Sequence, residues 1–201
     1  VLDRIAAAPT NEHAGVTGTD GKTTTSNLVS IILETAGQQN GLMTTANFRL
    51  NGQAWENSSR QSTLEALEVQ QFLRRALAAG ATHAVVETTS HGLELQRVRG
   101  CEFDVGVITN ITSEHLDFHK TIESYRRAKA RLFEMLDPTR LKDVATRPVA
   151  VLNRDDSSYE VLKPYCRVPI LDYGLDLRAA VRPVDVVLRA AVTARSGGSL
   201  R

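Results

Sequence analysis

The sequence predicts an α/β protein: a doubly wound, mostly parallel sheet with a phosphate-binding loop and a small hairpin insertion. Short apolar runs alternate along the chain with longer segments of helical period. Strands that alternate with helices in this way pack as parallel βαβ units. The first apolar run also leads into the glycine-containing segment 15–25, GVTGTDGKTTT, and directly from there into a helical pattern.

The expected strands are short and mostly apolar, and they fall at residues 13–18, 40–45, 83–87, 104–110, 148–153 and 168–173. Residues 47–55 place Asn51-Gly52 between two extended pieces, which is the strongest short-range signal of a hairpin. A further strand is expected at 185–194, with no later segment to pair with. Ligands of such sheets bind beyond the carboxyl ends of the strands, where this sequence places its polar clusters.

Two helices are predicted in the first half of the chain. The first is residues 22–37, in which Leu28, Ile31, Ile32 and Thr35 recur at the helical spacings of three and four. Gly37 can end this helix. Residues 63–80 form the second predicted helix, with Thr63 as its cap and Gly80 at its end.

A third helix is predicted at residues 121–136. Its apolar side consists of Ile122, Tyr125, Ala128, Leu132 and Leu136. Thr121 and Ser124 are both candidate caps, because hydroxyl side chains accept hydrogen bonds from the first free N–H groups of a helix.

Composition excludes several classes of protein. The 201 residues fit one domain or slightly more, and 42% hydrophobic residues can fill a core. With 24 Lys and Arg against 23 Asp and Glu, there is no basic field for nucleic acid. No apolar run reaches the roughly 20 residues of a membrane span, and the polar start is no signal peptide. Cys101 and Cys166 lack metal-type spacing and suit a reducing cytosol. We expect a cytoplasmic monomer without nucleic-acid or membrane partners.

Residues 15–25 have the layout of a phosphate-binding loop: a strand, a glycine turn, Gly-Lys-Thr and a helix. Glycines let backbone N–H groups approach phosphate oxygens, and the helix start adds its positive dipole end. Lys22 supplies a charge for the terminal phosphates, and the Thr23 hydroxyl can hold Mg²⁺. The candidate nucleotide-binding residues here are Gly18, Thr19, Asp20, Gly21, Lys22, Thr23 and Thr24. Val16 stands where the strict motif has a glycine, so the alternative is a plain strand-to-helix turn with a surface lysine.

Two charged residues elsewhere have both a structural and a functional interpretation. Glu87 ends the strand 83–87, where its carboxylate can bind Mg²⁺ or be merely solvated. Lys129 lies in the helix 121–136 beside apolar residues, where a lysine often extends its ammonium group to the surface.

A further cluster follows the strand 104–110, which Asn110 ends, and it consists of Glu114, His115, Asp117 and His119. His115 and His119 are four residues apart and could share a helix face as zinc ligands. The metalloprotease pattern requires Glu directly after the first His, however, and Leu116 stands there. Ordinary surface histidines are the other alternative.

Together, four motifs resemble those of the Mur ligase family, whose enzymes join amino acids to peptidoglycan precursors at the expense of ATP. TGTDGKTTT resembles the nucleotide loop, and ETTSHGLELQRV resembles Glu-x-Ser-Ser-His-Gly-Leu of the branch that adds the third peptide residue. TNITSEHLDFH resembles Thr-Asn-x-x-x-(Asp/Glu)-His-x-Asp, and YRRAKARLF resembles Tyr-x-x-Ala-Lys-x-x-Leu-Phe. RQSTLEALEV is a weaker match to a segment with Asn-Thr-Thr-Pro. The resemblance extends from about residue 15 to residue 173.

The resemblance implies roles for individual residues. Asn110 would join the nucleotide site. Catalysis would depend on Lys22, His115 and Lys129. The metal ligands would be Thr23, Glu87, His115 and Lys129, with Lys129 carbamylated so that it offers oxygen atoms to Mg²⁺. The muramyl nucleotide would contact Ser62, Thr63, Thr89 and Arg97. Leu95 stands where the family often has glutamine, and the proline before the helix 63–80 is lost.

The implied activity is ATP- and Mg²⁺-dependent amide-bond formation. ATP would phosphorylate UDP-MurNAc-L-Ala-D-Glu, and diaminopimelate or lysine would attack the acyl phosphate. Residues 1–201 are expected to be the central ATPase domain, a fragment without the N-terminal uridine-nucleotide domain and the C-terminal amino-acid domain, and inactive alone. Two alternatives stay open: another Mur-type ligase, similar to folylpolyglutamate or cyanophycin synthetase, and a non-catalytic nucleotide-binding paralogue.

Overall fold

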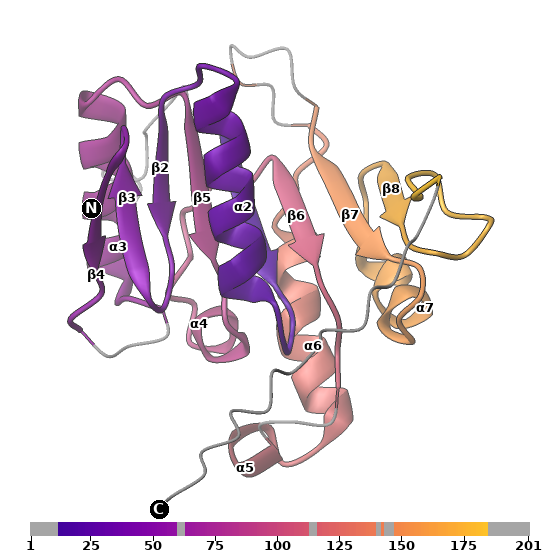
Figure 1. Cartoon of the computed structure of the whole chain (residues 1–201). Helices are drawn as coiled ribbons and strands as arrows, with labels where there is room; N and C mark the ends of the chain where they lie inside the picture. Colours follow the sequence, from indigo (N-terminus) through magenta and orange to yellow (C-terminus); the bar gives the residue numbers. More distant parts are fainter. Residues whose placement is uncertain (1–11, 60–62, 113–115, 140–141, 143–146, 185–201) are drawn as a thin grey trace, which may run out of the picture.

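The fold is a single eight-stranded sheet flanked by helices (Figure 1). The structure is a computed structural model that describes residues 12–59, 63–112, 116–139, 142 and 147–184. The strand order is β4-β3-β2-β5-β1-β6-β7-β8, and all pairs are parallel except β2–β3 and β3–β4. The predicted doubly wound, mostly parallel sheet is therefore confirmed. The strand expected at 185–194 lies outside the described residues.

The strands lie close to their predicted positions. They are β1 Glu12–Thr17, β2 Asn40–Met43, β3 Asn47–Leu50, β4 Gln53–Glu56, β5 His83–Glu87, β6 Val105–Ile108, β7 Val149–Asn153 and β8 Ile170–Tyr173. The predicted hairpin is β3–β4. Its turn residues Asn51 and Gly52 have φ angles of 48° and 83°, which are the positive values that a tight two-residue hairpin turn requires.

The three predicted helices are present, and short helices follow several strands. The helices are α2 Lys22–Thr35, α3 Ala66–Ala78, α4 Ser90–Glu94, α5 Leu116–His119, α6 Ile122–Glu134 and α7 Ser158–Leu162, with a 3₁₀ turn at Lys163–Tyr165. The hydroxyl of Thr121 caps α6 as predicted, because it accepts the Ser124 N–H. In the described part of the chain, no helix combines the length and apolar character needed to cross a membrane.

The predicted cap of α3 is wrong. Glu65 is the cap, and its side chain exchanges hydrogen bonds with Glu68 in a capping box. Thr63 is buried two residues earlier, where its hydroxyl bonds to that of Thr89, 2.9 Å away. A tertiary contact therefore occupies the hydroxyl that was expected to cap the helix.

Helices cover both faces of the sheet. α2 lies on one face, where Val29 and Leu33 pack against Val16, Leu42 and Val85. α3 and α6 lie on the other face (Figure 1), and their apolar side chains join the larger core cluster. This cluster includes the predicted apolar side of α6: Tyr125, Leu132 and Leu136 are each at most 1% exposed.

The residues that gave α2 its helical period do not face the sheet. Leu28, Ile31 and Ile32 are 54%, 44% and 65% exposed, whereas Ser26 and Ser30 are fully buried. Ser30 Oγ donates a 2.6 Å hydrogen bond to Asn40 Oδ1 at the start of β2. The inner side of α2 therefore combines the small residues Ser26 and Ser30 with Val29 and Leu33, and the ridge of Leu28, Ile31 and Ile32 lies outside.

A buried histidine is expected to make the stability pH-dependent. His13 in β1 is 3% exposed, and burial together with the Lys142 charge lowers its pKa from 6.5 to about 3. Between these values the unfolded chain binds a proton that the folded chain does not. The contribution of neutral His13 to the free energy of unfolding is complete above pH 6.5. It is lost as pH falls toward 3, by roughly 1.4 kcal/mol per pH unit. Urea unfolding should show that His13→Leu removes this part of the decline.

His83→Leu is the matched control, because His83 is only partly buried at the start of the neighbouring strand β5. The control should keep the acid decline of the unchanged chain. An equally steep decline in His13→Leu would show that other groups cause it.

Candidate nucleotide and metal site

The segment 18–21 lies at the point where the strand order of the sheet reverses. The chain passes from β1 toward β2 on one side of the sheet and from β6 toward β7 on the other, although β1 and β6 are neighbours. Open α/β sheets bind ligands in the crevice at such a switch point. The segment after β1 therefore occupies the expected place of a ligand site.

Glycines are required in this loop. A Cβ on Gly18 would lie 1.7 Å from Thr109 Oγ1, and Gly21 has a φ of +76°. The Thr19 N–H donates to Asn110 O, and the Asp20 N–H donates to Asn110 Oδ1. The loop is thus held against the end of β6. Gly21 also precedes α2 without a side chain that could satisfy its first N–H groups, which leaves them available to an anion.

A buried carboxylate faces the start of α2. Glu87 at the end of β5 is 2% exposed, and it accepts hydrogen bonds from Thr23 Oγ1 at 2.9 Å and Thr45 N at 3.0 Å. None of the described lysines or arginines forms an ion pair with it. Because a buried charge is costly without a partner of opposite charge, this position suits a cation.

Lys129 is the buried lysine of the site. It is 1% exposed, and its Nζ donates to Gly18 O at 2.7 Å and lies 4.4 Å from the Tyr125 ring centre. Burial, and next the positive charge of Lys22, hold the pKa of Lys129 well below its usual value, with Asp20 acting in the opposite direction. The environment therefore favours the neutral, nucleophilic amine. Lys22 itself is partly buried and donates to Thr19 O at 2.5 Å.

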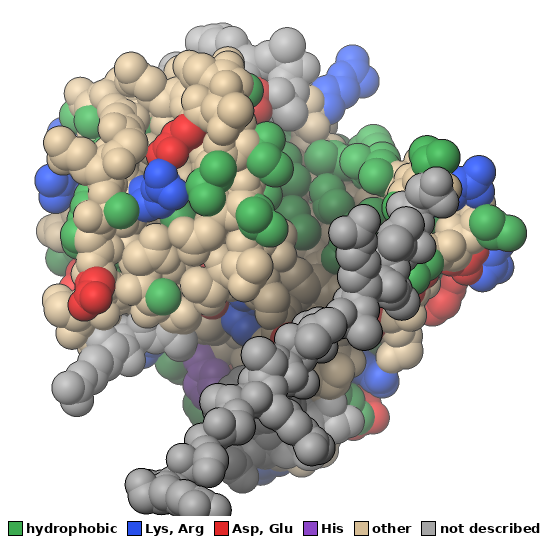
Figure 2. All heavy atoms as spheres, in the orientation of Figure 1, with side chains coloured by type: hydrophobic (Ala, Val, Ile, Leu, Met, Phe, Trp, Pro, Cys, Tyr) green, Lys and Arg blue, Asp and Glu red, His purple; other side chains and the backbone are tan. Residues whose placement is uncertain are grey.

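These side chains line one cavity of about 280 Å³, formed by Gly18, Lys22, Thr23, Thr45, Glu87, Thr89, Ser90, His91, Tyr125 and Lys129. In Figure 2, lysine or arginine and histidine side chains reach the surface below the lower end of α2. Sequence analysis missed Thr45. Its position at the end of the predicted strand 40–45, two residues after β2 and at the same edge of the sheet as Glu87, was the available signal.

The other candidate residues lie around this cavity. Asn110 binds the loop, whereas Thr24 lies on the exposed side of the first turn of α2. Arg97 donates to Thr63 O and pairs with Glu65. Thr63, Thr89 and Arg97 therefore form one group beside α4, and the two threonine hydroxyls bond to each other.

Two candidate residues, Ser62 and His115, lie outside the described residues, as does Glu114. His119 is 7% exposed, and its ring centre lies 5.3 Å from that of Tyr125 and 5.5 Å from that of His91. Within the described ranges, no three His, Cys, Asp or Glu side chains are grouped as metal ligands.

The sheet, the glycine loop at its switch point and the buried carboxylate together define an α/β protein with a phosphate-binding loop. The sequence matches the Mur ligase middle domain over residues 16–195, and the chain belongs to the Mur ligase family.

Individual relatives agree with this assignment. The UDP-N-acetylmuramyl-tripeptide synthetase of Roseiflexus sp. (strain RS-1) is 48% identical over 180 residues, which cover 86% of this chain and 35% of the relative. A solved UDP-N-acetylmuramoyl-L-alanyl-D-glutamate–2,6-diaminopimelate ligase superposes with a TM-score of 0.72 at 32% identity, covering 88% of this chain and 34% of its own. A MurF ligase from Thermotoga maritima in complex with ADP superposes with a TM-score of 0.58 at 17% identity, covering 87% of this chain and 35% of its own. At this low identity, the likeness shows the shared fold alone. The chain thus spans about a third of the length of these relatives.

Proposed function

We propose that the protein containing this chain is an ATP-dependent ligase that adds the third amino acid to UDP-MurNAc-L-Ala-D-Glu. The observation that carries the proposal is the convergence of Lys22, Glu87 and Lys129 on one cavity beside the glycine loop. The names of the relatives support the choice of substrate. Residues 1–201 would be the central ATPase domain, and separate domains would bind the uridine nucleotide and the amino acid. We expect the enzyme to act in the cytoplasm as a monomer.

The loop would hold the triphosphate of ATP. Its backbone N–H groups and the start of α2 suit phosphate oxygens, with Thr24 and Asn110 at the margins. Lys22 would exchange its present acceptor, Thr19 O, for the β- and γ-phosphates. In this position the Lys22 charge would stabilise the phosphates electrostatically, since phosphoryl transfer depends mainly on positioning and on neutralising charge.

The residues present fit Mg²⁺. The buried Glu87 carboxylate and the Thr23 hydroxyl offer the oxygen ligands that this ion prefers. Lys129 and His115 would complete a second metal position. Bound Mg²⁺ would neutralise charge on the γ-phosphate.

Lys129 would first become a carbamate. Its neutral amine would form an N–C bond with CO₂ and release a proton, which gives an anion with two oxygen atoms. The lowered pKa of Lys129 supports this step, because a protonated amine cannot attack CO₂.

The substrate carboxylate would lie near Thr89, with Ser62, Thr63 and Arg97 contacting the muramyl nucleotide. Its attack on the γ-phosphorus would break the bond to the β-phosphate and release ADP. The amine of diaminopimelate or lysine would then attack the acyl phosphate and release phosphate. The chain's part in both steps is to orient the reactants and screen their charges.

The test compares acceptors in the full-length protein with ATP and Mg²⁺. Phosphate release and a new amide product should require the muramyl dipeptide nucleotide together with diaminopimelate or lysine. Turnover only with a folate acceptor and glutamate would instead identify a folylpolyglutamate synthetase. No ATP-dependent turnover with any acceptor would favour the non-catalytic paralogue.

A further inference from the structure

The hydrogen bonds of the buried Glu87 carboxylate are unevenly divided between its two oxygens. Oε2 accepts three, from Thr23 Oγ1 at 2.9 Å, Thr45 N at 3.0 Å and Thr45 Oγ1 at 3.3 Å. Among the described residues, Oε1 accepts only one, at 3.4 Å, and it comes from the same Thr45 hydroxyl. Because a hydroxyl has a single proton to donate, Oε1 keeps most of its acceptor capacity for a ligand of the cavity that Glu87 lines.

Thr45 makes most of these contacts. Its backbone N–H and its hydroxyl both reach Glu87, and the hydroxyl also lies 3.3 Å from Thr23 Oγ1. Thr45 follows β2, whereas Thr23 lies in the first turn of α2 and Glu87 ends β5. A third segment of the chain therefore contacts both side chains whose oxygen atoms suit Mg²⁺.

The position of Thr45 is itself fixed by a polar network. The preceding hydroxyl, Thr44 Oγ1, accepts the Asn47 N–H at 2.9 Å and donates to Asn47 O at 2.8 Å, which closes the turn between β2 and β3. The side-chain amides of Asn47 and Asn27 exchange hydrogen bonds of 3.0 and 3.1 Å. Asn27 Nδ2 also donates to Thr23 O at 2.9 Å. The turn that carries Thr45 is thus tied to the helical turn that carries Thr23.

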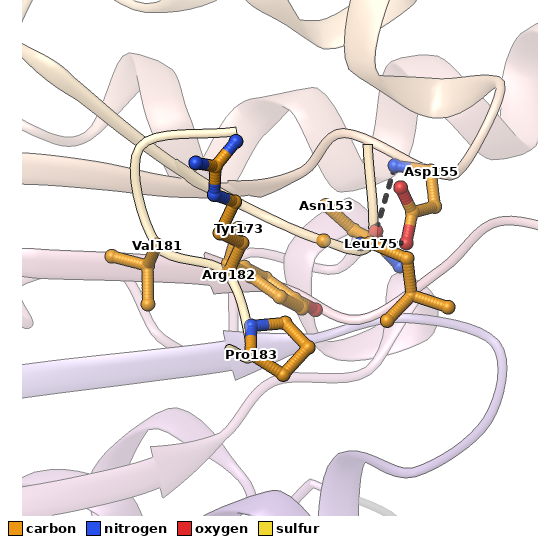
Figure 3. A pocket seen from close by; sticks show the side chains of 8 residues that line it. Asn153, Asp155, Tyr173, Leu175, Val181, Arg182 and Pro183 are labelled. Carbon is orange, nitrogen blue, oxygen red and sulfur yellow. Dashed lines mark hydrogen bonds between the residues drawn. The ribbon is translucent and has the colours of Figure 1, made fainter. Parts of the chain in front are cut away.

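A carboxylate in another cavity has the opposite arrangement. Asp155 contributes to the wall of a cavity of about 340 Å³ at the carboxyl ends of β7 and β8 (Figure 3). Each of its two oxygens accepts a backbone N–H, one from Leu175 at 2.6 Å and one from Asp176 at 2.9 Å. Both oxygens of Asp155 therefore hold a loop of the chain itself. At Glu87 the bonds gather on one oxygen, which leaves the other for a ligand.

We propose that Thr45 is a positioning residue of the metal site: its hydroxyl holds Glu87 so that Oε1 faces the cation beside Thr23. This inference rests on the proposed function. Thr45 supplies no ligand atom and acts through Glu87. Hydrogen bonds of this kind orient the carboxylates that bind metals, and Mg²⁺ is sensitive to their orientation because it demands nearly ideal octahedral geometry.

The first test measures the affinity of the full-length protein for Mn²⁺ by EPR. Mn²⁺ is paramagnetic and, like Mg²⁺, favours octahedral oxygen ligands. Thr45→Val nearly keeps the shape of the side chain and keeps the backbone N–H bond to Glu87, but it removes the hydroxyl. It should weaken Mn²⁺ binding roughly 10–100-fold, the usual loss when a partner of a metal ligand is removed. Thr45→Ser, which retains a hydroxyl, should bind Mn²⁺ nearly as well as the unaltered protein.

Thr88→Val is the matched control, because it also removes a threonine hydroxyl next to the site. Thr88 is fully buried, and its hydroxyl donates to Val16 O rather than to Glu87. The Thr88 N–H donates to the same carbonyl, so the substitution leaves Val16 O with a partner. Mn²⁺ affinity should not change in this variant.

The second test follows ligation against Mg²⁺ concentration. In Thr45→Val, the concentration that gives half of the maximal rate should rise roughly 10–100-fold. The rate at saturating Mg²⁺ should stay close to that of the unaltered enzyme, because the ligands themselves are all present. A reduced maximal rate with an unchanged Mg²⁺ requirement would indicate a structural defect and overturn the inference.

Glu87→Gln separates this inference from the proposed function. Loss of Mn²⁺ binding in Glu87→Gln but not in Thr45→Val would overturn the role of Thr45 and leave the proposed function intact. Equal losses in Thr45→Val and Thr45→Ser would also overturn it, since the hydroxyl would not be the group responsible. If Glu87→Gln binds Mn²⁺ as tightly as the unaltered protein, the metal position in the proposed function is wrong, and this inference falls with it.

Discussion

Replacing Lys22 by alanine is expected to lower ATP-dependent ligation by the full-length enzyme by at least 10²–10³-fold, the loss typical when a charge-stabilising group is removed. Its ammonium group lies at the first turn of α2, within the cavity that also contains Glu87 and Lys129. No other described lysine except Lys129 lines that cavity, and Lys129 is engaged with Gly18 O. Rates of phosphate release and amide formation under saturating ATP measure the effect.

Two controls separate this loss from misfolding. Lys163→Ala removes a lysine from the 3₁₀ turn after α7, outside the cavity, and should leave the rate unchanged. The thermal midpoint of Lys22→Ala should remain close to that of the unaltered enzyme, because the hydrogen bond from Lys22 Nζ to Thr19 O stays within its own loop. Ligation that survives the substitution would remove Lys22 from the mechanism.

The segment from β1 through the loop to α2 could be predicted because its information is local. Gly18 and Gly21 stand where a side chain would clash or where φ is positive, and Lys22 begins the helix. The hairpin is similar, since Asn51-Gly52 supplies both positive φ angles of its turn. At these positions the local backbone conformation determines which residue types fit.

Other features depend on contacts between distant segments and were not predictable. The hydroxyl of Thr63 bonds to Thr89, 26 residues away, so Glu65 caps α3 in its place. The exposed ridge of α2 has the helical period that normally marks a buried face, while Ser26 and Ser30 pack inward. Periodicity predicts a helix, but it does not say which side the sheet will cover.

Lys129 shows the same limit within the site. In the sequence, it has the place of a lysine that reaches solvent from the flank of α6. In the structure, its acceptor is Gly18 O, 111 residues earlier, and the Tyr125 ring lies beneath it. Only this tertiary arrangement buries the amine and lowers its pKa. The motif indicated which lysine to consider, and the fold provides the environment in which it can react.

Replacing Lys129 by alanine is expected to abolish ligation, and short carboxylic acids such as formate or acetate should restore part of the activity. The substitution removes the proposed carbamate and leaves room beside Gly18 and Tyr125. A small carboxylate that diffuses into this space would again supply oxygen atoms to the cavity that Glu87 also lines. Ligation rates measured against acid concentration should rise and saturate, as expected for a binding site. In the unaltered enzyme, ¹³C-labelled bicarbonate should give a carbamate NMR signal that Lys129→Ala lacks.

Lys22→Ala is the matched control for rescue, because it also removes an amine from the same cavity. Carboxylic acids should not restore its activity, since the missing group there is a cation. Rescue of both variants would indicate a general effect of the acids rather than a site for an anion. Absence of rescue in Lys129→Ala, together with absence of the NMR signal, would mean that residue 129 acts as an unmodified amine. The lowered pKa would then keep that amine neutral beside Lys22, so that two positive charges need not share the loop.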